Sequence, residues 1–415
     1  MFDVWRRVSL RHGFEEYEGP TLEYLELYRE KSGDELVGQL FTLTDSGNRE
    51  LALRPEMTPT LARMVAAKIN ALAKPIKWFC MPRLFRGENV QRGRLREFFQ
   101  WNVDVIGTAD VIADAECILV GVEALRELGL SDKDFAVHIS NRRLIAAILT
   151  AAGIAHEAHA GAYAILDKAG KIDETELARR WGEHYESQIA FTALMELLRC
   201  GGLASLKTSV SRFATANAEL EAAFEETQRL FDILGEFGIS DFCKLNLRVV
   251  RGLAYYTGPV FEFFDRGESE RAICGGGRYD DLLGKLGKSK EPAVGFGMGD
   301  VVLALMLKDR NLLTDPLAVP PVFVADASEG LRGKLHELVA ALRRAGFAAE
   351  FSYHQQAVGK QLKAADKKRC RIALILGDET RDRGVVQLKP MQGGDSREIA
   401  WDALLRNPGE FLGQP

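Results

Sequence analysis

The chain has 415 residues, 27% of them charged, and a formal net charge of −5. This length and composition fit an ordinary globular protein of two or three domains, and they exclude a disordered chain and a uniformly basic nucleic-acid-binding protein. No apolar run approaches the roughly 18 residues of a membrane span, and no signal-peptide pattern opens the chain. We therefore expect a cytoplasmic protein without a membrane anchor.

Six cysteines lie scattered along the chain without a Cys-x-x-Cys pair. We interpret them as reduced, packed thiols and expect no metal site. His156 and His159 have no third ligand nearby in the sequence, so we expect them on the surface. Residues 319–415 carry 15 Lys or Arg against 12 Asp or Glu, and this mildly basic balance is compatible with an RNA contact.

Periodicity and turn residues predict the elements of the first 72 residues. In chain order these are a helix over 2–12 that ends at Gly13, a short strand over 14–17, a helix over about 21–31 after Pro20, a hairpin of residues 39–43 and 51–53, and a helix to about Leu72. Thr58 is a good N-cap for this last helix and Pro59 a good first helical residue.

A carboxylate stands just before that helix, in the run Arg54-Pro55-Glu56-Met57-Thr58. Glu56 is placed to receive an ammonium group near the start of the helix. The alternative interpretation is a surface or capping carboxylate.

Residues 83–107 contain two strand-like runs around a charged, turn-rich centre. The loop between them has about ten residues, whereas an ordinary hairpin closes in about two to five, so we interpret it as a loop kept for binding. Guanidinium groups beside rigid strands suit phosphate, because the planar fork can grip two oxygens at once. A charged surface hairpin is the alternative. The charged residues of this centre are Arg86, Glu88, Arg92, Arg94, Arg96 and Glu97.

The rest of the chain reads as an α/β protein with a long helical segment. The expected elements are a helix over 110–128, a strand over 135–139, a helix from about Arg142, a mostly helical stretch over 155–235, strands over 244–250 and 260–264, and a glycine-rich strand running into a helix over 293–302. After a proline-containing linker near 311–320 we expect strands over 321–325, 348–353, 372–376 and 385–389, with helices over 328–345, 358–369 and from about Trp401.

The stretch from Arg251 to Gly258, Arg-Gly-Leu-Ala-Tyr-Tyr-Thr-Gly, lies between two predicted strands. Arg251 supplies a fixed cation, while Tyr255 and Tyr256 supply flat walls with hydroxyl tips. Such walls can enclose an aromatic ring and hydrogen-bond its nitrogens. The alternative is a buried strand whose arginine pairs with a core carboxylate.

Three glycines at 275–277 precede Arg278 and Tyr279. We interpret them as a glycine-rich turn, because residues without a side chain let a backbone approach a ligand closely.

Taken in order, these stretches resemble the histidyl-tRNA synthetases, a family of class II aminoacyl-tRNA synthetases. Phe-Arg-x-Glu at 85–88 and Gly-Arg-x-Arg-x-Phe-x-Gln at 93–100 resemble motif 2, and residues 54–58 resemble the run that binds the α-amino group of histidine. Residues 251–258 resemble the family signature, and residues 293–302 resemble motif 3. Residues 2–31 resemble motif 1 more weakly, and the likeness covers essentially the whole chain.

The resemblance implies ATP-dependent ligation of L-histidine to tRNA(His) through a histidyl-adenylate, with Mg²⁺ bridging phosphates and a homodimer as the assembly. It implies catalytic roles for Arg86 and Arg251 on two sides of the α-phosphate. It implies that Glu56, Thr58, Gln100, Asp104, Tyr255, Tyr256 and Tyr279 bind histidine, and that Arg86, Glu88, Arg94 and Arg278 bind ATP. Many bacterial members of the family carry Glu where Asp104 stands, so the reach here is one methylene shorter.

The sequence departs from the family in two places. Motif 3 usually ends Gly-x-Glu-Arg, but this chain has Asp300, Val301 and Val302 after Gly299. Arg278, Arg271 or the arginines of the motif 2 loop are the candidates to replace the missing arginine. The family usually has an Arg-Gly-containing lead-in before the first helix, whereas the sequence starts at Met1 without it. Either the start is misassigned or the edge of the site differs.

The fold class implied is α/β, with an antiparallel-sheet class II catalytic core. We expect the first part of this core over 1–154, a helical insertion over 155–235, the second part over 236–315, and an α/β anticodon-binding domain over 319–415. A basic helix over 358–368 is typical of that last domain, although a solvated helix face would look the same.

Two other functions remain open. One is a paralogue that senses histidine as a regulatory subunit of ATP phosphoribosyltransferase; the missing motif 3 arginine favours it, and the C-terminal domain and complete signature oppose it. The other is a class II synthetase for another amino acid, which the paired tyrosines and Asp104 oppose.

Overall fold

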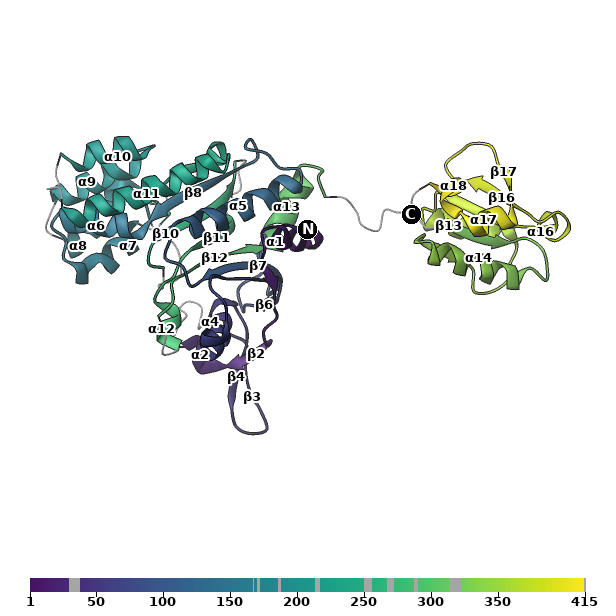
Figure 1. Cartoon of the computed structure of the whole chain (residues 1–415), viewed down its shortest axis with the longest axis horizontal. Helices are drawn as coiled ribbons and strands as arrows, with labels where there is room; N and C mark the ends of the chain where they lie inside the picture. The colour runs from purple at the N-terminus through teal and green to yellow at the C-terminus, as the bar shows by residue number, and fades with distance from the viewer. Residues whose placement is uncertain are drawn as a thin grey trace. The chain divides into compact units, whose positions relative to one another are not determined.

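The computed structural model describes residues 1–29, 38–166, 168–169, 172–185, 188–212, 217–249, 256–266, 272–286, 290–313 and 322–413. The chain divides into two compact units, Met1–Leu313 and Thr314–Pro415 (Figure 1). Each unit has its own hydrophobic core. No helix among these residues is long and apolar enough to cross a membrane.

The centre of the first unit is a largely antiparallel sheet, as the family resemblance implies. Nine strands of the described chain form it, eight of them in the order β1-β5-β7-β12-β11-β10-β8-β9 with β6 paired to β7. Only the outer pairs β1–β5 and β8–β9 are parallel among these neighbours. The strands are β1 Glu15–Glu16, β5 Ile76–Cys80, β6 Arg83–Phe85, β7 Glu97–Ile106, β8 Phe135–Asn141, β9 Cys243–Leu245, β10 Pro259–Asp265, β11 Ala272–Arg278 and β12 Ala293–Gly299.

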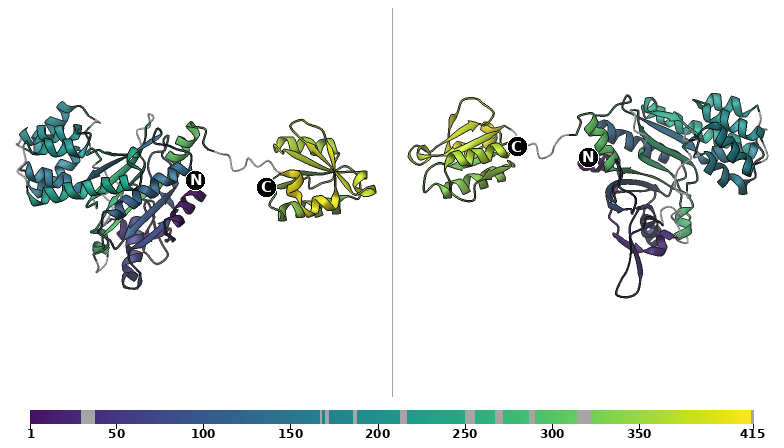
Figure 2. Two further views of the ribbon diagram at one scale, coloured as in Figure 1. Left: turned by 45° about the horizontal axis from the view of Figure 1, so that its top comes forward. Right: turned by 180° about the vertical axis from the view of Figure 1, so that it is seen from behind.

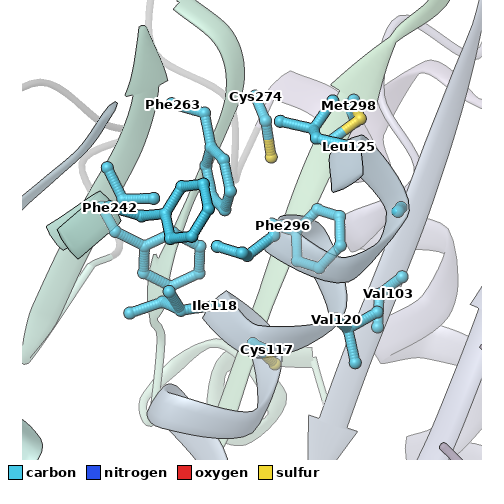
Figure 3. Close-up of a cluster of buried hydrophobic side chains, with 14 of the residues drawn as sticks. Val103, Cys117, Ile118, Val120, Leu125, Phe242, Phe263, Cys274, Phe296 and Met298 are labelled. Carbon is cyan, nitrogen blue, oxygen red and sulfur yellow. The ribbon is translucent and has the colours of Figure 1, made fainter. Parts of the chain in front are cut away.

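One face of this sheet is apolar because side chains alternate along β7. Trp101, Val103 and Val105 are buried against helices on that face. Figure 3 shows part of this cluster, in which Phe296 and Met298 of β12 lie among helix side chains. The helices that contribute to it are α1 Phe2–Arg11, α5 Ile112–Glu127, α11 Ala218–Glu236 and α13 Asp300–Asp309. The opposite face is therefore left to carry polar residues.

The helices predicted over 155–235 are present and form a module at one end of the first unit (Figure 2). They pack with α6 around a second core that includes Trp181 and Leu206. His159 is buried, and its Nε2 lies 3.1 Å from the Ile154 carbonyl oxygen, so the expected surface position is wrong for this histidine. The elements are α6 Arg142–Ala151, α7 His159–Leu166, α8 Glu174–His184, α9 Gln188–Arg199 and α10 Leu203–Val210, with short 3₁₀ turns at His156–Ala158 and Ser240–Phe242.

A small three-stranded sheet, in the order β2-β4-β3, lies beside the N-terminal half of this unit. The predicted helix over 21–31 is wrong at its start, since Leu22–Tyr24 pairs with β4 before the helix begins. The hairpin of β3 and β4 is confirmed. The elements are β2 Leu22–Tyr24, α2 Leu25–Arg29, β3 Thr42–Thr44, β4 Glu50–Leu53, α4 Thr58–Lys68, the 3₁₀ turn Ile69–Ala71 and α12 Leu282–Leu286.

The second unit is a mixed α/β domain. Its sheet has the order β14-β13-β15-β16-β17, parallel among the first three strands and antiparallel at the last two. The parallel-type arrangement expected from the sequence is thus only half of the sheet, and β17 and α16 were not expected. The elements are β13 Val322–Asp326, α14 Arg332–Arg344, β14 Ala349–Phe351, α15 Val358–Lys367, β15 Ile372–Leu376, α16 Asp378–Asp382, β16 Val385–Pro390, β17 Arg397–Ala400, α17 Trp401–Arg406 and α18 Pro408–Leu412.

Candidate active site

The polar face of the large sheet carries a row of polar side chains on β7 beside glycines of β11 and β12. We call Gly277, Gly295 and Gly297 the glycine floor. Gln100, Asn102 and Asp104 occupy alternate positions of β7, and their partners on β12 include Gly295 and Gly297. A Cβ at Gly295 would lie 2.1 Å from Oδ1 of Asp104, and one at Gly297 would lie 2.7 Å from Cδ of Gln100. The glycines therefore supply the space that these two side chains occupy.

Asp104 and Tyr279 meet on this floor. The Tyr279 hydroxyl donates to Oδ1 of Asp104 at 2.5 Å, and both residues are almost completely buried. Burial raises the pKa of Asp104 to about 7, against a smaller lowering by the Tyr279 hydrogen bond. The carboxyl group is thus close to its titration point near neutral pH.

Tyr256 lies against the same floor. A Cβ at Gly277 would lie 3.2 Å from Cδ1 of Tyr256. Burial raises the pKa of the Tyr256 hydroxyl, and the nearby carboxylates of Glu56 and Asp104 raise it further. The structure therefore brings Tyr256, Glu56 and Asp104 into one neighbourhood.

The three glycines that the sequence suggests form a turn are part of strand β11 instead. Gly276 faces the apolar side, where a Cβ would lie 2.5 Å from the Gly295 carbonyl oxygen and 2.6 Å from the Phe296 side chain. Tight packing between neighbouring strands, and not chain reversal, accounts for the glycine there.

The start of α4 lies beside this site. Glu56 is 4% exposed, and Thr58 is the first residue of the helix, with Met57 at the N-cap position. The N-cap therefore lies one residue earlier than predicted, and Thr58 is the first helical residue instead of the cap.

The motif 2 strands place Arg86 at the end of β6. Its Nε donates to the Pro55 carbonyl oxygen at 2.9 Å, and its guanidinium carbon is 5.2 Å from the centroid of the Phe98 ring. This hydrogen bond joins motif 2 to the run that contains Glu56. Beyond Arg86, the side chains of Glu88 and Arg94 form an ion pair of 2.8 Å across the loop.

Arg278 is placed away from the position expected of an ATP ligand. The side chain is 1% exposed and forms a buried ion pair with Asp114, with Nε 3.1 Å from Oδ2. Its Nη atoms donate to the Thr108 and Asp110 carbonyl oxygens and to Asp280. These contacts bind the guanidinium nitrogens to groups inside the protein, which contradicts the expected ATP contact.

Two of the predicted residues, Arg251 and Tyr255, lie outside the described residues, as does Arg271. Asn102 was missed in the sequence, although it lies on the polar face between Gln100 and Asp104. The period of two along β7 was the signal that could have found it. Asp300, at the altered end of motif 3, accepts a hydrogen bond of 3.1 Å from the Phe99 amide and so joins α13 to β7.

Comparison with known proteins agrees with this geometry. Residues 5–300 match the family model described as histidyl-tRNA synthetase, and residues 321–407 match the anticodon binding domain. The histidine–tRNA ligase of Opitutus terrae is 40% identical over 392 residues, covering 94% of this chain and 89% of that protein. The chain belongs to the histidyl-tRNA synthetase family.

Other members of the family show the same extent of similarity. The chloroplastic/mitochondrial histidine–tRNA ligase of Arabidopsis thaliana is 34% identical, over 96% of this chain and 81% of the relative. The crystal structure of histidyl-tRNA synthetase from Nostoc sp. PCC 7120 superposes with a TM-score of 0.84 at 25% identity, covering 99% of this chain and 94% of that one. A Bacillus halodurans protein described as an ATP phosphoribosyltransferase regulatory subunit/histidyl-tRNA synthetase gives a TM-score of 0.74 at 26% identity, over 91% and 93%. The α/β fold with an antiparallel class II core is thereby established.

Proposed function

We propose that this protein ligates L-histidine to tRNA(His) in two steps. Histidine and ATP first form histidyl-adenylate with release of pyrophosphate, and the histidyl group is then transferred to the terminal ribose of the tRNA with release of AMP. The ligase activity accords with membership of the family. The observation that carries the choice of amino acid is the buried pair of Asp104 and Tyr279 on the glycine floor.

In this proposal Asp104 binds the imidazole and Glu56 the α-amino group. Asp104 would accept a hydrogen bond from an imidazole N–H, which offsets the burial that raises its pKa. Tyr256 and Tyr279 would line the ring, with Tyr255 beside them. The buried Glu56 would receive the ammonium group of histidine.

Thr58 and Gln100 complete the proposed histidine set, from the start of α4 and from β7. A site that relies on buried hydrogen bonds rejects amino acids that cannot form them, because its polar groups would then be left unsatisfied.

Arginines would neutralise the phosphates. Attack of the histidine carboxylate on the α-phosphorus of ATP adds negative charge to the transferring group, and fixed cations stabilise it. Arg86 would hold the α-phosphate and carboxylate from one side and Arg251 from the other. Glu88 would lie near the adenine and Arg94 near the outer phosphates.

The missing motif 3 arginine needs a substitute. The buried pairing of Arg278 with Asp114 supports leaving Arg278 out of the ATP site. The motif 2 loop is the better source, since the side chains of Arg92 and Arg94 are 78% and 50% exposed.

The remaining partners follow from the same proposal. Mg²⁺ would arrive with ATP as a substrate ion held by phosphate oxygens; in the described residues no group of three His, Cys, Asp or Glu side chains is arranged to hold a metal. The second unit would bind the anticodon of the tRNA. We propose a cytoplasmic homodimer as the working form.

The test is histidine-dependent ATP–pyrophosphate exchange with a panel of amino acids. We expect histidine alone to support exchange, and Arg86→Ala to lower the rate about 100-fold, as removal of a transition-state donor does. Arg83→Ala is the matched control, because Arg83 begins the strand that Arg86 follows and forms an exposed pair with Glu97.

Two outcomes would contradict the proposal. Histidine binding without exchange would indicate a histidine sensor of the kind named for the Bacillus halodurans protein. Exchange driven by another amino acid would indicate a class II synthetase of different specificity.

A further inference from the structure

The end of the tyrosine signature is held in place by the first turn of α6. This helix follows β8 directly and begins with Arg142 and Arg143. Nη1 of Arg142 donates to the Tyr256 carbonyl oxygen at 3.2 Å, and Nε of Arg143 donates to the Thr257 carbonyl oxygen at 3.2 Å. Two guanidinium groups from one helix therefore bind two consecutive carbonyl groups of the signature.

Arg143 also joins this backbone to two other elements. Its Nη1 donates to Oε1 of Glu226 on α11 at 2.6 Å, and its Nη2 donates to Oδ2 of Asp280 at 2.7 Å. The Asn141 side chain caps α6 by accepting from the Arg143 amide at 2.9 Å and donates to Glu226 at 2.8 Å. The Arg143 side chain thus contacts the signature, the helical module and the segment that follows β11.

The opposite side of the same segment is fixed by β11. The Thr257 amide donates to the Arg278 carbonyl oxygen at 2.7 Å, and the Asp280 amide donates to the Thr257 hydroxyl at 3.1 Å. Tyr279, whose hydroxyl contacts Asp104, lies between Arg278 and Asp280. Arg143 therefore contacts the backbone carbonyl of the residue after Tyr256 and the side-chain carboxylate of the residue after Tyr279.

From these contacts we infer that Arg142 and Arg143 are positioning residues for histidine binding, which set the place of Tyr256 against the glycine floor. The inference rests on the proposed function, since it names residues that act on the histidine end of that site. Neither arginine belongs to the set that the sequence suggested. The planar fork of Arg143 is suited to this task because it can donate to a carbonyl and two carboxylates at once.

The experiment compares Arg143→Gln with wild type in histidine-dependent exchange. We expect the KM for histidine to rise about tenfold, the size that one lost charge-assisted hydrogen bond gives, while the KM for ATP changes less than about twofold. Arg199→Gln is the matched control, because Arg199 forms an exposed ion pair with Glu174 in the helical module, away from the signature. The control should leave both constants unchanged.

Two further variants separate positioning from general stability. Arg143→Lys should give an intermediate KM for histidine, because one ammonium group cannot reproduce the planar fork. Glu226→Gln should shift the KM for histidine in the same direction, since Glu226 fixes the Arg143 side chain from α11. Thermal unfolding of each variant shows whether a change in the KM for histidine comes with a loss of stability.

Equal rises in the KM values for histidine and ATP, or a loss of thermal stability with an unchanged KM for histidine, would overturn the inference. Histidine affinity measured by titration calorimetry on the same variants separates this inference from the proposed function. If wild type binds histidine but does not catalyse exchange, the proposed function fails, and weaker binding by Arg143→Gln alone still supports the positioning role. If wild type does not bind histidine, both fail.

Discussion

Replacement of Asp104 by Asn should make the protein more stable and less active. Burial raises the pKa of Asp104 from 3.8 to about 7 in the folded protein, whereas the unfolded chain ionises near the ordinary value. Between these two pKa values the folded state holds a proton that the unfolded state releases, so stability falls as pH rises. Above pH 7 the folded state bears the full free-energy cost of an ionised, buried Asp104, and below pH 4 this cost is absent.

The size of the effect follows from the shift. About three pKa units at about 1.4 kcal/mol each give an upper limit of about 4 kcal/mol at pH 8. Roughly a third of this should remain at pH 5. The amide oxygen that Asp104→Asn introduces can still accept a hydrogen bond from the Tyr279 hydroxyl, so this contact of the wild type is kept.

The assay is urea unfolding of wild type and Asp104→Asn at pH 8 and pH 5, with and without histidine. We expect the variant to unfold at higher urea, more so at pH 8, and histidine to stabilise only the wild type. A variant that is less stable than wild type at pH 8 would refute the interpretation that burial destabilises the ionised form of Asp104. A stability difference between the two proteins that grows as pH falls would refute it as well. Strong stabilisation of the variant by histidine would refute its role in binding.

Three other predictions follow from the site and the domain division. Gly295→Ala should abolish most histidine-dependent exchange and cost about 1–3 kcal/mol, because the new Cβ meets both Asp104 and a backbone oxygen; normal exchange and an unchanged urea midpoint would count against it. Arg278→Met should destabilise by about 3–5 kcal/mol in urea unfolding by leaving Asp114 buried without its cation, whereas a raised KM for ATP at full stability would restore the ATP-binding role. A chain ending at Leu313 should keep histidine-dependent exchange but lose most tRNA charging, as measured with labelled histidine; equal loss of both activities would disagree.

Sequence patterns predicted the parts of this fold in which local signals and packing agree. The strand-like runs on either side of the turn-rich loop and the apolar periodicity of α5 were sufficient to place the central hairpin and the helix that follows it. Glu56 was singled out by its place just before a helix, where a capping carboxylate would look the same. Asp104 could be proposed only through resemblance to a family, since no local pattern distinguishes it from an ordinary carboxylate.

The errors arose where contacts distant in sequence decide the structure. Leu22–Tyr24 forms a strand because it pairs with β4, and nothing within the segment itself reveals that partner. Gly276 and Gly277 are glycines because neighbouring backbone and side-chain atoms leave no room for a Cβ, a cause that looks the same as a turn in the sequence. Arg278 was proposed as a substitute for the missing motif 3 arginine, because nothing near it in the sequence reveals its buried partner Asp114, which lies 164 positions earlier in the chain.

The alternation along β7 also limits how this enzyme can change over evolution. Substitution at Gln100, Asn102 or Asp104 alters the polar face and leaves the apolar core on the other face intact. Deletion of one residue within Glu97–Ile106 would instead exchange the two faces, bringing Trp101 to the polar face and a carboxylate into the core. New specificity is therefore accessible here through point substitutions, while length changes belong to the loop before β7.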